Sequence, residues 1–499
     1  MKTRKPMTDE EREFFATVAA AAFANPFSRE RNEFDRQIAG MERGDVGREE
    51  MVQRVTVRVA ERLARLEREG RADLRLYDEA EQRTVGVAFL FNVYHRFRND
   101  LDSFIPVQLR AGDTPCRVPF AREALAMLSR LGFAEEEAWK YFAIFYQLRR
   151  AFFFIESSLV GVSPSMHTLR LHLWNNVFTC NIGLFDTHLW KRMEDFSTLL
   201  LGETGTGKGA AAAAIGRSCF IPFDPAKGCF VESFTRNFIP LNLSQYPETL
   251  IESELFGHRK GAFTGAVGHH EGVFSRCTPH GSIFLDEIGD LSVPVQIKLL
   301  QVLQERTFSP VGSHERLRFH GRVIAATNRP LGEMRRRGQF RDDFYYRLCS
   351  DIITVPPLRQ RVHENPRELD VMVGHLLARM VGETRRELVE MVLDILRRDL
   401  PPDYPWPGNV RELEQAVRRI LLTRSYQGDL AADDGVDFGA AAVAERTVDA
   451  QTLLATYCRR LYERYGTYEE VARRLRLDRR TVKKYLQGEG KGTEAPGPG

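Results

Sequence analysis

The sequence predicts a multidomain protein in which a central α/β region lies between helical regions. Up to about residue 162, apolar residues recur at helical spacing, as in Glu49–Glu69 and Phe120–Gly132. From Thr198 onward, short β-branched or apolar runs alternate with helical stretches, which favours a mainly parallel sheet. The helical pattern returns in Glu364–Ser425 and again in Val448–Leu486. We therefore expect an α/β core with a helical region before it and two after it.

Composition and charge limit the classes of protein to which this chain can belong. The 499 residues suggest about three domains, and a chain that is 43% apolar and 28% charged is ordinary for a globular protein. The net charge of +3 is too small to indicate nucleic-acid binding without local clustering. The seven cysteines are scattered and none has CxxC spacing, which fits a reducing compartment. With neither a signal-peptide core nor an apolar run of about 18 residues, we expect a cytoplasmic protein that makes no membrane contact.

The most apolar stretch of the amino-terminal region is Tyr141–Ile155, which nevertheless carries Arg149 and Arg150. We expect it to form a buried helix within the longer helical segment Ala134–Leu159, with a partner-docking helix as the alternative. The segment 163–197 is unusually aromatic and is expected to pack against this helical region.

The first strand run, Thr198–Leu201, leads into a GxxxxGK motif followed by a helical run, Gly209–Arg217. Glycines let the backbone approach phosphate oxygens, the amides point inward, and the following helix adds its positive end. We expect Lys208 to reach the outer phosphates of ATP. Gly209 stands where the general motif has a Ser or Thr ligand for magnesium. The predicted nucleotide-binding residues here are Gly202, Glu203, Thr204, Gly205, Thr206, Gly207, Lys208 and Gly209.

A second apolar strand, beginning at Ser282, ends in two carboxylates, Asp286 and Glu287. An acidic pair at a strand end is common, but after a phosphate-binding loop it predicts a catalytic pair. Asp286 would hold magnesium through water, and Glu287 would polarise the attacking water.

Between these two elements lie six residues in which glycines and alanines flank one aromatic and one hydroxyl side chain. An aromatic residue on an exposed loop favours contact with a partner over core packing. The predicted contact residues are Gly261, Ala262, Phe263, Thr264, Gly265 and Ala266.

This order of motifs resembles the bacterial enhancer-binding proteins, the NtrC-type AAA+ ATPases that activate sigma-54 RNA polymerase. The resemblance covers about residues 231–416 and the phosphate loop, and includes Ser253–His258 and Pro356–Arg361. It implies that the six-residue GAFTGA loop contacts sigma-54. In this family the residue after the lysine is usually acidic, so Gly209 departs from the family as well.

The resemblance also assigns roles to other strand ends and to two later segments. Asn242 would hydrogen-bond Glu287, although a turn-forming role is the alternative. Thr327 and Asn328 would lie near the γ-phosphate. Arg341 and Arg347 would act as arginine fingers across a subunit boundary. Arg411 would touch the nucleotide from a helical lid, with Asn409 as the cap of its helix.

A His/Cys-rich patch follows the loop at His269, His270, Cys277 and His280. Zinc would need four converging ligands, so solvated loop residues are the favoured interpretation.

The carboxyl-terminal unit has the pattern of a Fis-like helix-turn-helix. Seven basic residues and one acidic residue lie between Arg473 and Lys484, which fits contact with DNA phosphates. Asp478 is the expected cap of the second helix, while Arg476 replaces the glycine common in the turn. A charged helical hairpin is the alternative. The inward face would be Val471, Ala472, Leu475, Leu477, Val482 and Leu486, and the expected DNA contacts are Arg479, Arg480, Thr481, Lys483 and Lys484.

Together these patterns predict an ATP-dependent activator that binds upstream enhancer DNA and assembles a homo-oligomeric ring, expected to be a hexamer, with magnesium as cofactor and the sigma-54 RNA polymerase holoenzyme as partner. A DNA-binding repressor that uses the ATPase core as an assembly switch, and a general protein remodeller, are the alternatives. The region before the core has no receiver-like pattern, so a partner protein, a small ligand or oligomerisation could supply its signal. The expected segments are a helical regulatory domain (1–162), the AAA+ α/β core (163–356), the helical lid (357–425), a linker (426–447), the helix-turn-helix (448–487) and a tail (488–499).

Overall fold

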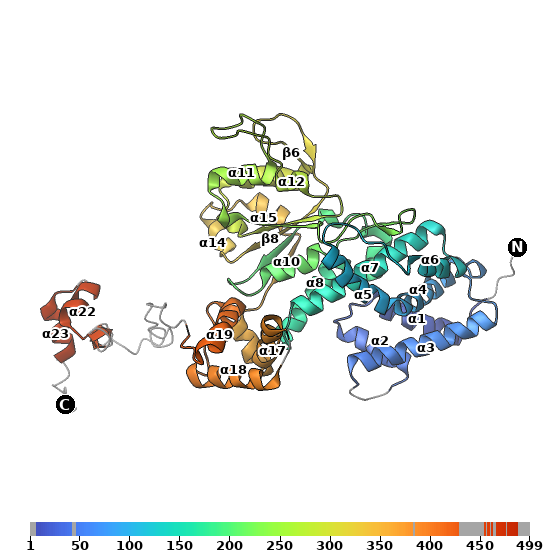
Figure 1. Ribbon diagram of the computed structural model, residues 1–499, viewed down its shortest axis with the longest axis horizontal. Coiled ribbons are helices and arrows are strands. Elements are labelled where there is room, and N and C mark those ends of the chain that lie inside the picture. Colours follow the sequence, from blue (N-terminus) through green and yellow to red (C-terminus); the bar gives the residue numbers. More distant parts are fainter. Residues whose placement is uncertain are drawn as a thin grey trace, which may run out of the picture. The chain divides into compact units, whose positions relative to one another are not determined.

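The computed structural model describes residues 6–41, 46–382, 385–428, 454–455, 457–459, 461–462, 466–475 and 477–487. The chain forms two compact units, Met1–Gln427 and Gly428–Gly499 (Figure 1). The predicted linker from residue 429, Arg476 and the predicted tail 488–499 lie outside the described residues. No helix among the residues described has both the length and the hydropathy to cross a bilayer.

The first unit begins with a helical bundle, as predicted. The helical patterns at 49–69, 120–132 and 134–159 correspond to helices α3 (Arg48–Arg68), α6 (Ala121–Arg130) and α7 (Glu135–Ser158). A capping box formed by Thr8 and Glu11 starts the first helix. The helices are α1 (Asp9–Phe23), α2 (Arg29–Ala39), α3 (Arg48–Arg68), α4 (Glu79–Arg96), α5 (Arg98–Ala111), α6 (Ala121–Arg130) and α7 (Glu135–Ser158).

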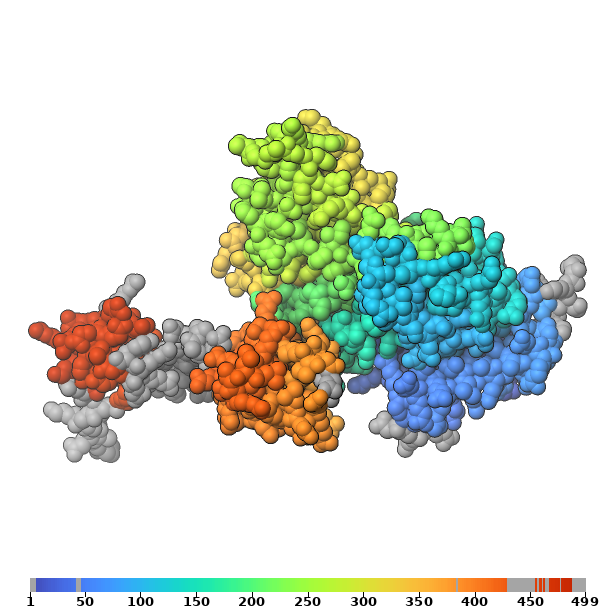
Figure 2. All heavy atoms as spheres, in the orientation of Figure 1, coloured from blue at the N-terminus to red at the C-terminus, as the bar shows by residue number. Residues whose placement is uncertain are grey.

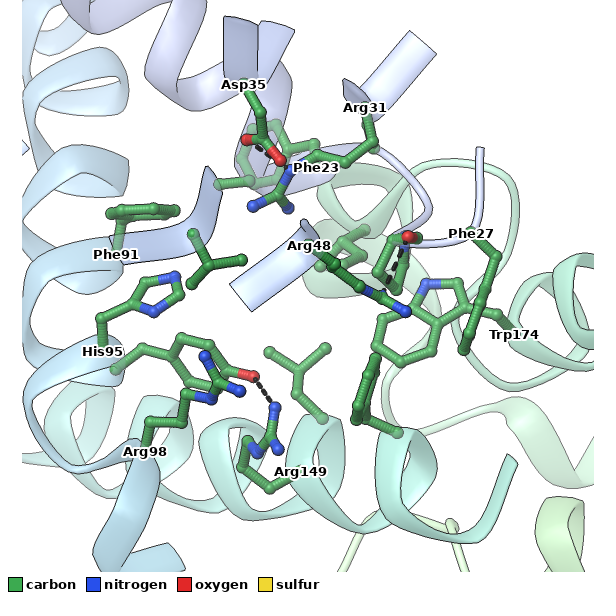
Figure 3. A pocket seen from close by; sticks show the side chains of 18 of the residues that line it. Phe23, Phe27, Arg31, Asp35, Arg48, Phe91, His95, Arg98, Arg149 and Trp174 are labelled. Carbon is green, nitrogen blue, oxygen red and sulfur yellow. Dashed lines mark hydrogen bonds and ion pairs between the residues drawn. The ribbon is translucent and has the colours of Figure 1, made fainter. Parts of the chain in front are cut away.

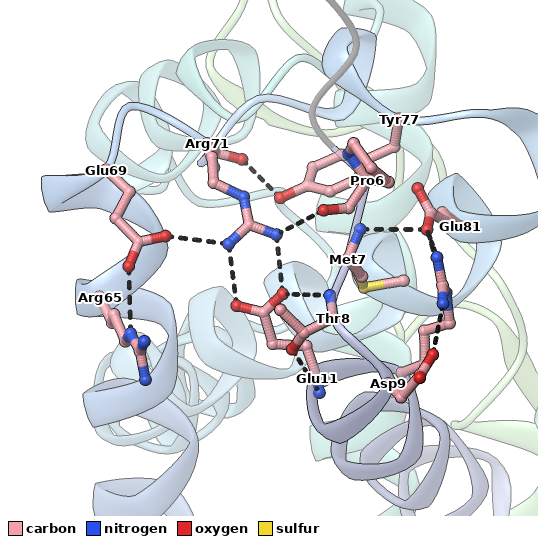
Figure 4. Close-up of polar contacts among 11 residues, drawn as sticks. Pro6, Met7, Thr8, Asp9, Glu11, Arg65, Glu69, Arg71, Tyr77 and Glu81 are labelled. Carbon is pink, nitrogen blue, oxygen red and sulfur yellow. Dashed lines mark hydrogen bonds and ion pairs between the residues drawn. The ribbon is translucent and has the colours of Figure 1, made fainter.

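A buried ion pair ties the start of the chain to the loop after α3 (Figure 4). Arg71 donates two hydrogen bonds to the Glu11 carboxylate, at 2.9 and 2.7 Å, and one to the carbonyl of Pro6 at 3.0 Å. Tyr77 donates to the Arg71 carbonyl at 2.8 Å. Arg71 and Glu11 are 9% and 8% exposed, so removing Arg71 would leave the Glu11 carboxylate with little water around it.

We expect Arg71→Met to lower the free energy of unfolding by about 3 kcal/mol, because Glu11 would remain buried without its partner. Hydrogen bonding to Arg71 lowers the pKa of Glu11. The stabilisation is therefore present above the ordinary value of 4.5 and is lost as the pH falls through the lowered one. Urea denaturation at neutral and acid pH measures both effects. Arg75→Met is the control, since Arg75 is 62% exposed and pairs with Asp73 at the surface. Equal stability of the two variants would contradict this account.

Helix α7 is buried along most of its length, which confirms the interpretation of its apolar stretch. Tyr146 stacks on Phe230 at 4.1 Å between ring centroids. Arg150 is fully buried and donates to the carbonyl oxygens of Arg217 and Cys219, each at 2.7 Å. These carbonyls follow the helix after the phosphate loop, α10 (Lys208–Gly216). A guanidinium at the carbonyl end of a helix is favoured by the helix dipole, which explains a charge inside an apolar helix.

The α/β region is built on a five-stranded parallel sheet in the order β4-β5-β8-β1-β9. The two predicted strands, Thr198–Leu201 and the one that begins at Ser282, are confirmed, whereas the edge strand β9 was not foreseen. Alternate strand residues enter two cores: Leu200 and Ile324 pack with the amino-terminal helices, and Leu199 and Val323 pack on the other face. The strands are β1 (Thr198–Leu201), β4 (Phe238–Asn242), β5 (Ser282–Asp286), β8 (Arg322–Thr327) and β9 (Asp351–Thr354).

Smaller elements complete this region. The sheet is flanked by α10, α11 (Glu248–Phe256), α12 (Val273–Arg276), α13 (Val293–Glu305), α14 (Leu331–Arg336) and α15 (Asp342–Leu348). Two short antiparallel pairs are β2 (Phe223–Asp224) with β3 (Cys229–Phe230) and β6 (Thr307–Phe308) with β7 (Leu317–Arg318).

Helix α8 (Pro164–Phe178) joins the amino-terminal helices to the sheet. Asn25 donates to the carbonyl of Leu171 at 2.9 Å, and Asn176 donates to Thr198 and Asp351 at 3.0 and 2.6 Å. The expected packing of this segment on the amino-terminal region is confirmed. The blue and green surfaces meet without a break in Figure 2.

Four helices after the sheet share a separate core: α16 (Leu358–Glu364), α17 (Arg367–Val381), α18 (Arg386–Asp399) and α19 (Asn409–Thr423). In this group, which we call the lid, a buried pair of Arg361 and Glu368 is 2.5 Å apart. Glu368 also accepts from the amides of Val162 and Ser163 at 2.6 and 2.9 Å, so the lid holds the connection between α7 and α8.

The second unit contains α22 (Tyr468–Leu475) and α23 (Arg479–Gln487). Val471, Ala472 and Val482 are buried, and Leu475, Leu477 and Leu486 pack against them, which confirms the predicted inward face. Asp478 accepts from the amide of Arg480 at 2.7 Å and so caps α23 as expected.

Candidate functional site

The phosphate loop joins β1 to α10, and its glycines take conformations that other residues avoid. Gly205 and Gly207 have φ of 79° and 107°. Lys208 is 7% exposed and donates to the carbonyls of Gly202 and Glu203 at 2.9 and 3.2 Å. The ammonium group therefore lies inside the loop, where it can exchange these carbonyls for phosphate oxygens.

The two carboxylates stand at the end of β5, close to this lysine. Burial raises the pKa of Asp286, while the charge of Lys208 opposes that rise. Burial likewise lowers the pKa of Lys208, and Glu287 and Asp286 oppose that change. Glu287 has φ of 56°, a left-handed conformation that is strained for a non-glycine residue.

Asn328 connects this acidic pair to the phosphate loop. Its amide donates to Glu287 Oε2 at 3.4 Å, and its side chain donates to Thr204 Oγ1 at 2.8 Å. Thr327 is fully buried, and its hydroxyl accepts from the amide of Arg329 at 3.0 Å. Asn328 therefore faces the catalytic edge, and Thr327 supports the backbone beside it.

Asn242 lies next to Asp286 in the register of β4 and β5. Its side-chain oxygen accepts from the amide and the hydroxyl of Ser244, at 3.0 and 2.7 Å. Between these described residues, no hydrogen bond joins Asn242 to Glu287. In this conformation Asn242 forms a turn, which was the alternative considered for it.

The lid contacts the phosphate loop through Arg359 and Asn409, to which the sequence had assigned no contact with this loop. Arg359 forms a bidentate pair with Glu203 and lowers the pKa of that carboxyl group. Asn409 is fully buried and donates to Glu203 and to the carbonyl of Thr204, at 3.2 and 3.1 Å. It also accepts from the amide of Leu358 at 2.8 Å.

The prediction that Asn409 caps the lid helix is wrong. The cap position is Gly408, and Asn409 has φ of 53° with its side chain turned to the phosphate loop. The amide of Val410 donates to the Gly205 carbonyl at 3.0 Å, and a Cβ on Gly205 would lie 3.2 Å from Cβ of Arg411. Arg411 therefore stands over the loop, where its charge adds to the effect of burial that lowers the pKa of Lys208 and opposes the effect of burial that raises the pKa of Asp286.

The two candidate arginine fingers, Arg341 and Arg347, form hydrogen bonds within their own chain. Arg341 pairs with Asp343 at 2.9 and 2.6 Å. Arg347 donates to the carbonyl of Leu303 at 3.0 and 2.8 Å. The structure gives neither arginine a contact with the described phosphate loop or acidic pair of the same chain.

The GAFTGA segment forms a closed loop with an exposed tip. The amide of Gly261 donates to the Ala266 carbonyl at 2.9 Å, and the amide of Ala266 donates to the Phe263 carbonyl at 3.0 Å. Thr264 is exposed, whereas the ring of Phe263 lies edge-on against His258 at 4.9 Å and is 37% exposed. Val267, just outside the motif, is 82% exposed. The exposed tip therefore presents Thr264 and part of the Phe263 ring, both of which the sequence had indicated.

The His/Cys patch does not converge. His269 contacts the carbonyl of His258, and His270 lies 3.5 Å from Glu254. Across the described part of the chain, no group of three or more His, Cys, Asp or Glu side chains could hold a metal ion.

On the second unit, Arg479, Arg480, Lys483 and Lys484 are exposed, and Thr481 is half-buried. Arg479 pairs with Glu469 at 2.7 Å. Three of the four basic side chains on α23 thus have no acidic partner among the described residues.

Residues 187–354 match the family model described as "Sigma-54 interaction domain". The chain is 39% identical over 229 residues to the regulatory protein AtoC of Escherichia coli (strain K12), covering 46% of each chain. It is 43% identical over 226 residues to the nitrogen fixation protein VnfA of Azotobacter vinelandii, covering 45% of this chain and 40% of the relative. The chain thus spans less than half the length of these relatives.

Among solved structures, NtrX from Brucella abortus in complex with ATP covers 75% of this chain and 81% of its own, with 21% identity and a TM-score of 0.40. Residues 187–354, which contain the α/β region, are thus similar to the sigma-54 interaction domain, the family that the order of the motifs indicated.

Proposed function

We propose that this protein is an ATP-dependent activator of sigma-54 RNA polymerase. One observation carries the proposal: an intact GAFTGA loop lies between a phosphate loop and an acidic pair, inside a region that matches the sigma-54 interaction domain. The exposed Thr264 and the half-exposed Phe263 would meet the polymerase-bound factor.

The catalytic edge of the sheet would bind and hydrolyse ATP. Lys208 and the loop amides would hold the phosphates, and Glu287 would orient and polarise the attacking water. Asn328, which contacts both Glu287 and the phosphate loop, would respond to the presence of the γ-phosphate. Magnesium fits beside Asp286, because a carboxylate is the hard oxygen ligand that this cation prefers, and Gly209 offers no side-chain oxygen. When bound, the ion would neutralise phosphate charge.

Assembly of the chain into a ring, a hexamer by our proposal, would complete the site. Arg341 and Arg347 make no contact with their own phosphate loop, which supports their delivery to a neighbouring subunit. The exposed basic face of α23 supports contact with upstream DNA. The amino-terminal helices would regulate the ring.

A reporter driven by a sigma-54-dependent promoter tests the proposal. We expect Thr264→Ala to abolish activation while ATP hydrolysis persists, because the tip acts on the partner and lies outside the nucleotide site. Val267→Ala is the matched control, since Val267 is more exposed than Phe263 but stands outside the motif. Activation by Thr264→Ala at the wild-type level would count against the mechanism.

A further inference from the structure

The amino-terminal helices line a cavity of about 750 Å³ that no part of the proposed function uses (Figure 3). Its walls come from α1, α2, α3, α4, α5, α7 and α8 and from the segments that join them. This volume falls in the range of about 300–1,000 Å³ that small-molecule sites occupy.

The walls are largely aromatic. Phe27 stacks on Phe152 at 5.7 Å and meets Trp174 edge-on at 6.1 Å. Phe91 lies 4.2 Å from the ring of His95. Flat, apolar walls of this kind suit an aromatic or hydrocarbon body.

The cavity also carries an excess of positive charge. Its acidic side chains are Asp35, Glu49, Glu156 and Asp186, and its arginines are Arg31, Arg36, Arg48, Arg98, Arg149 and Arg170. Three of the acids are already paired, Asp35 with Arg31 at 2.9 Å, Asp186 with Lys140 at 2.6 Å and Glu156 with Arg170 at 3.9 Å.

Two arginines line the cavity with no carboxylate oxygen at hydrogen-bonding distance among the described residues. Arg48 lies over the rings of Phe27 and Phe152, at 5.2 and 4.7 Å, and its hydrogen bond goes to the Pro26 carbonyl. Arg98 has its nearest carboxylate oxygen, on Asp102, at 3.9 Å, and its buried Nε has no hydrogen-bond partner. By contrast, Asp102 already satisfies Arg149 at 2.6 and 2.8 Å.

The cavity wall contains another hydrogen-bond donor without a partner among the described residues, the indole N–H of Trp174. Trp174 is 4% exposed, and its buried indole N–H has no partner. Buried polar groups normally find one, so an unpaired N–H beside a cavity points to a missing acceptor. Burial and the charges of Arg31, Arg98 and Arg149 also lower the pKa of His95 well below its ordinary value, as expected where positive charge accumulates.

We propose that this cavity binds a small organic carboxylate, with its apolar body among the aromatic rings and its charged group toward Arg48 and Arg98. A carboxylate matches the fork of a guanidinium and adds charge-assisted hydrogen bonds. An uncharged molecule would fill the apolar space but would leave these donors unpaired.

The cavity walls are also the elements that hold the α/β region. On α7, Arg149 faces the cavity and the next residue, Arg150, binds the carbonyls that follow α10. On α8, Trp174 lines the cavity and Asn176 binds strands β1 and β9. A ligand that orders α7 and α8 would therefore also affect the strands and the helix that carry the nucleotide site. We infer that such a ligand regulates ATP hydrolysis, an inference that rests on the proposed function.

Calorimetric titration of the full chain with 2-naphthoate tests the binding. The matched probes are 2-naphthylmethanol, which lacks the charge, and 2-naphthyl phosphate. We expect saturable binding of 2-naphthoate that Arg98→Gln weakens by about tenfold or more. Arg83→Gln is the control, because Arg83 lies on α4 but is 78% exposed and pairs with Glu79 at the surface.

Several outcomes would overturn the proposal: no saturable binding of 2-naphthoate, equal binding of the alcohol, binding of the phosphate alone, or an unchanged affinity in Arg98→Gln. Heat of binding needs no turnover, so this result is independent of the ATPase. Hydrolysis is then measured with and without 2-naphthoate. A changed rate in wild type that is lost in Arg98→Gln supports regulation, and binding with an unchanged rate overturns it.

Discussion

Glu287→Gln is expected to bind ATP normally and to hydrolyse it about 10²–10⁴-fold more slowly than the wild type, the usual size of a lost general base. The amide is close to the carboxylate in shape and can still accept from the amide of Asn328, which lies 3.4 Å away. It cannot take up a proton from water. Equilibrium binding of a fluorescent ATP analogue and steady-state phosphate release measure the two properties separately.

Asp290→Asn is the matched control for this experiment. Asp290 lines the same hollow as Glu287 and Asn328, but its carboxylate pairs with Arg329 at 2.5 Å. Arg329 already holds this carboxylate, so we expect hydrolysis to persist. Equal losses in both variants would mean that the local charge matters, and that Glu287 has no specific role.

The backbone conformation of Glu287 predicts a substitution that lowers activity without lowering stability. Its φ of 56° costs about 1–3 kcal/mol for a non-glycine residue. Glu287→Gly should therefore unfold at a temperature no lower than the wild type while it loses hydrolysis. Stability and activity that fall together would show that the side chain is structural.

The sheet could be predicted from sequence because its central strands are buried on both faces and flanked by clear helical runs. Strand β9 was missed because Asp351–Thr354 is short, begins with an acid and lies at the sheet edge. The phosphate loop and the acidic pair were found because each is a local motif whose neighbours set its geometry.

The features that were missed depend on residues far apart in the chain. Glu203 and Arg359 are 156 residues apart in the chain, and the sequence around neither residue predicts that the two form a pair. Asn409 has the residue type of a cap, but its contacts with the phosphate loop hold it in a left-handed conformation. The described residues that line the cavity come from many helices between α1 and α8 and from the segment after α8, so no single periodic pattern in the sequence indicates the cavity.

The shape of the GAFTGA tip should prove as important as its side chains. Gly265 has φ of 104°, a region that residues with a Cβ rarely adopt, although open space surrounds it. We expect Gly265→Ala to change the turn at Thr264 and to abolish activation from a sigma-54 promoter, while ATP hydrolysis persists. Reporter activity and phosphate release are the measurements.

Gly268→Ala separates backbone conformation from crowding. Gly268 also has open space around it, but its φ lies outside the left-handed region. An added methyl group there should leave activation near the wild-type level. If the two alanine variants lost activation equally, added bulk near the tip would explain the defect. If neither lost it, the left-handed turn would not be needed to present Thr264, and the loop would act on its partner through side chains alone.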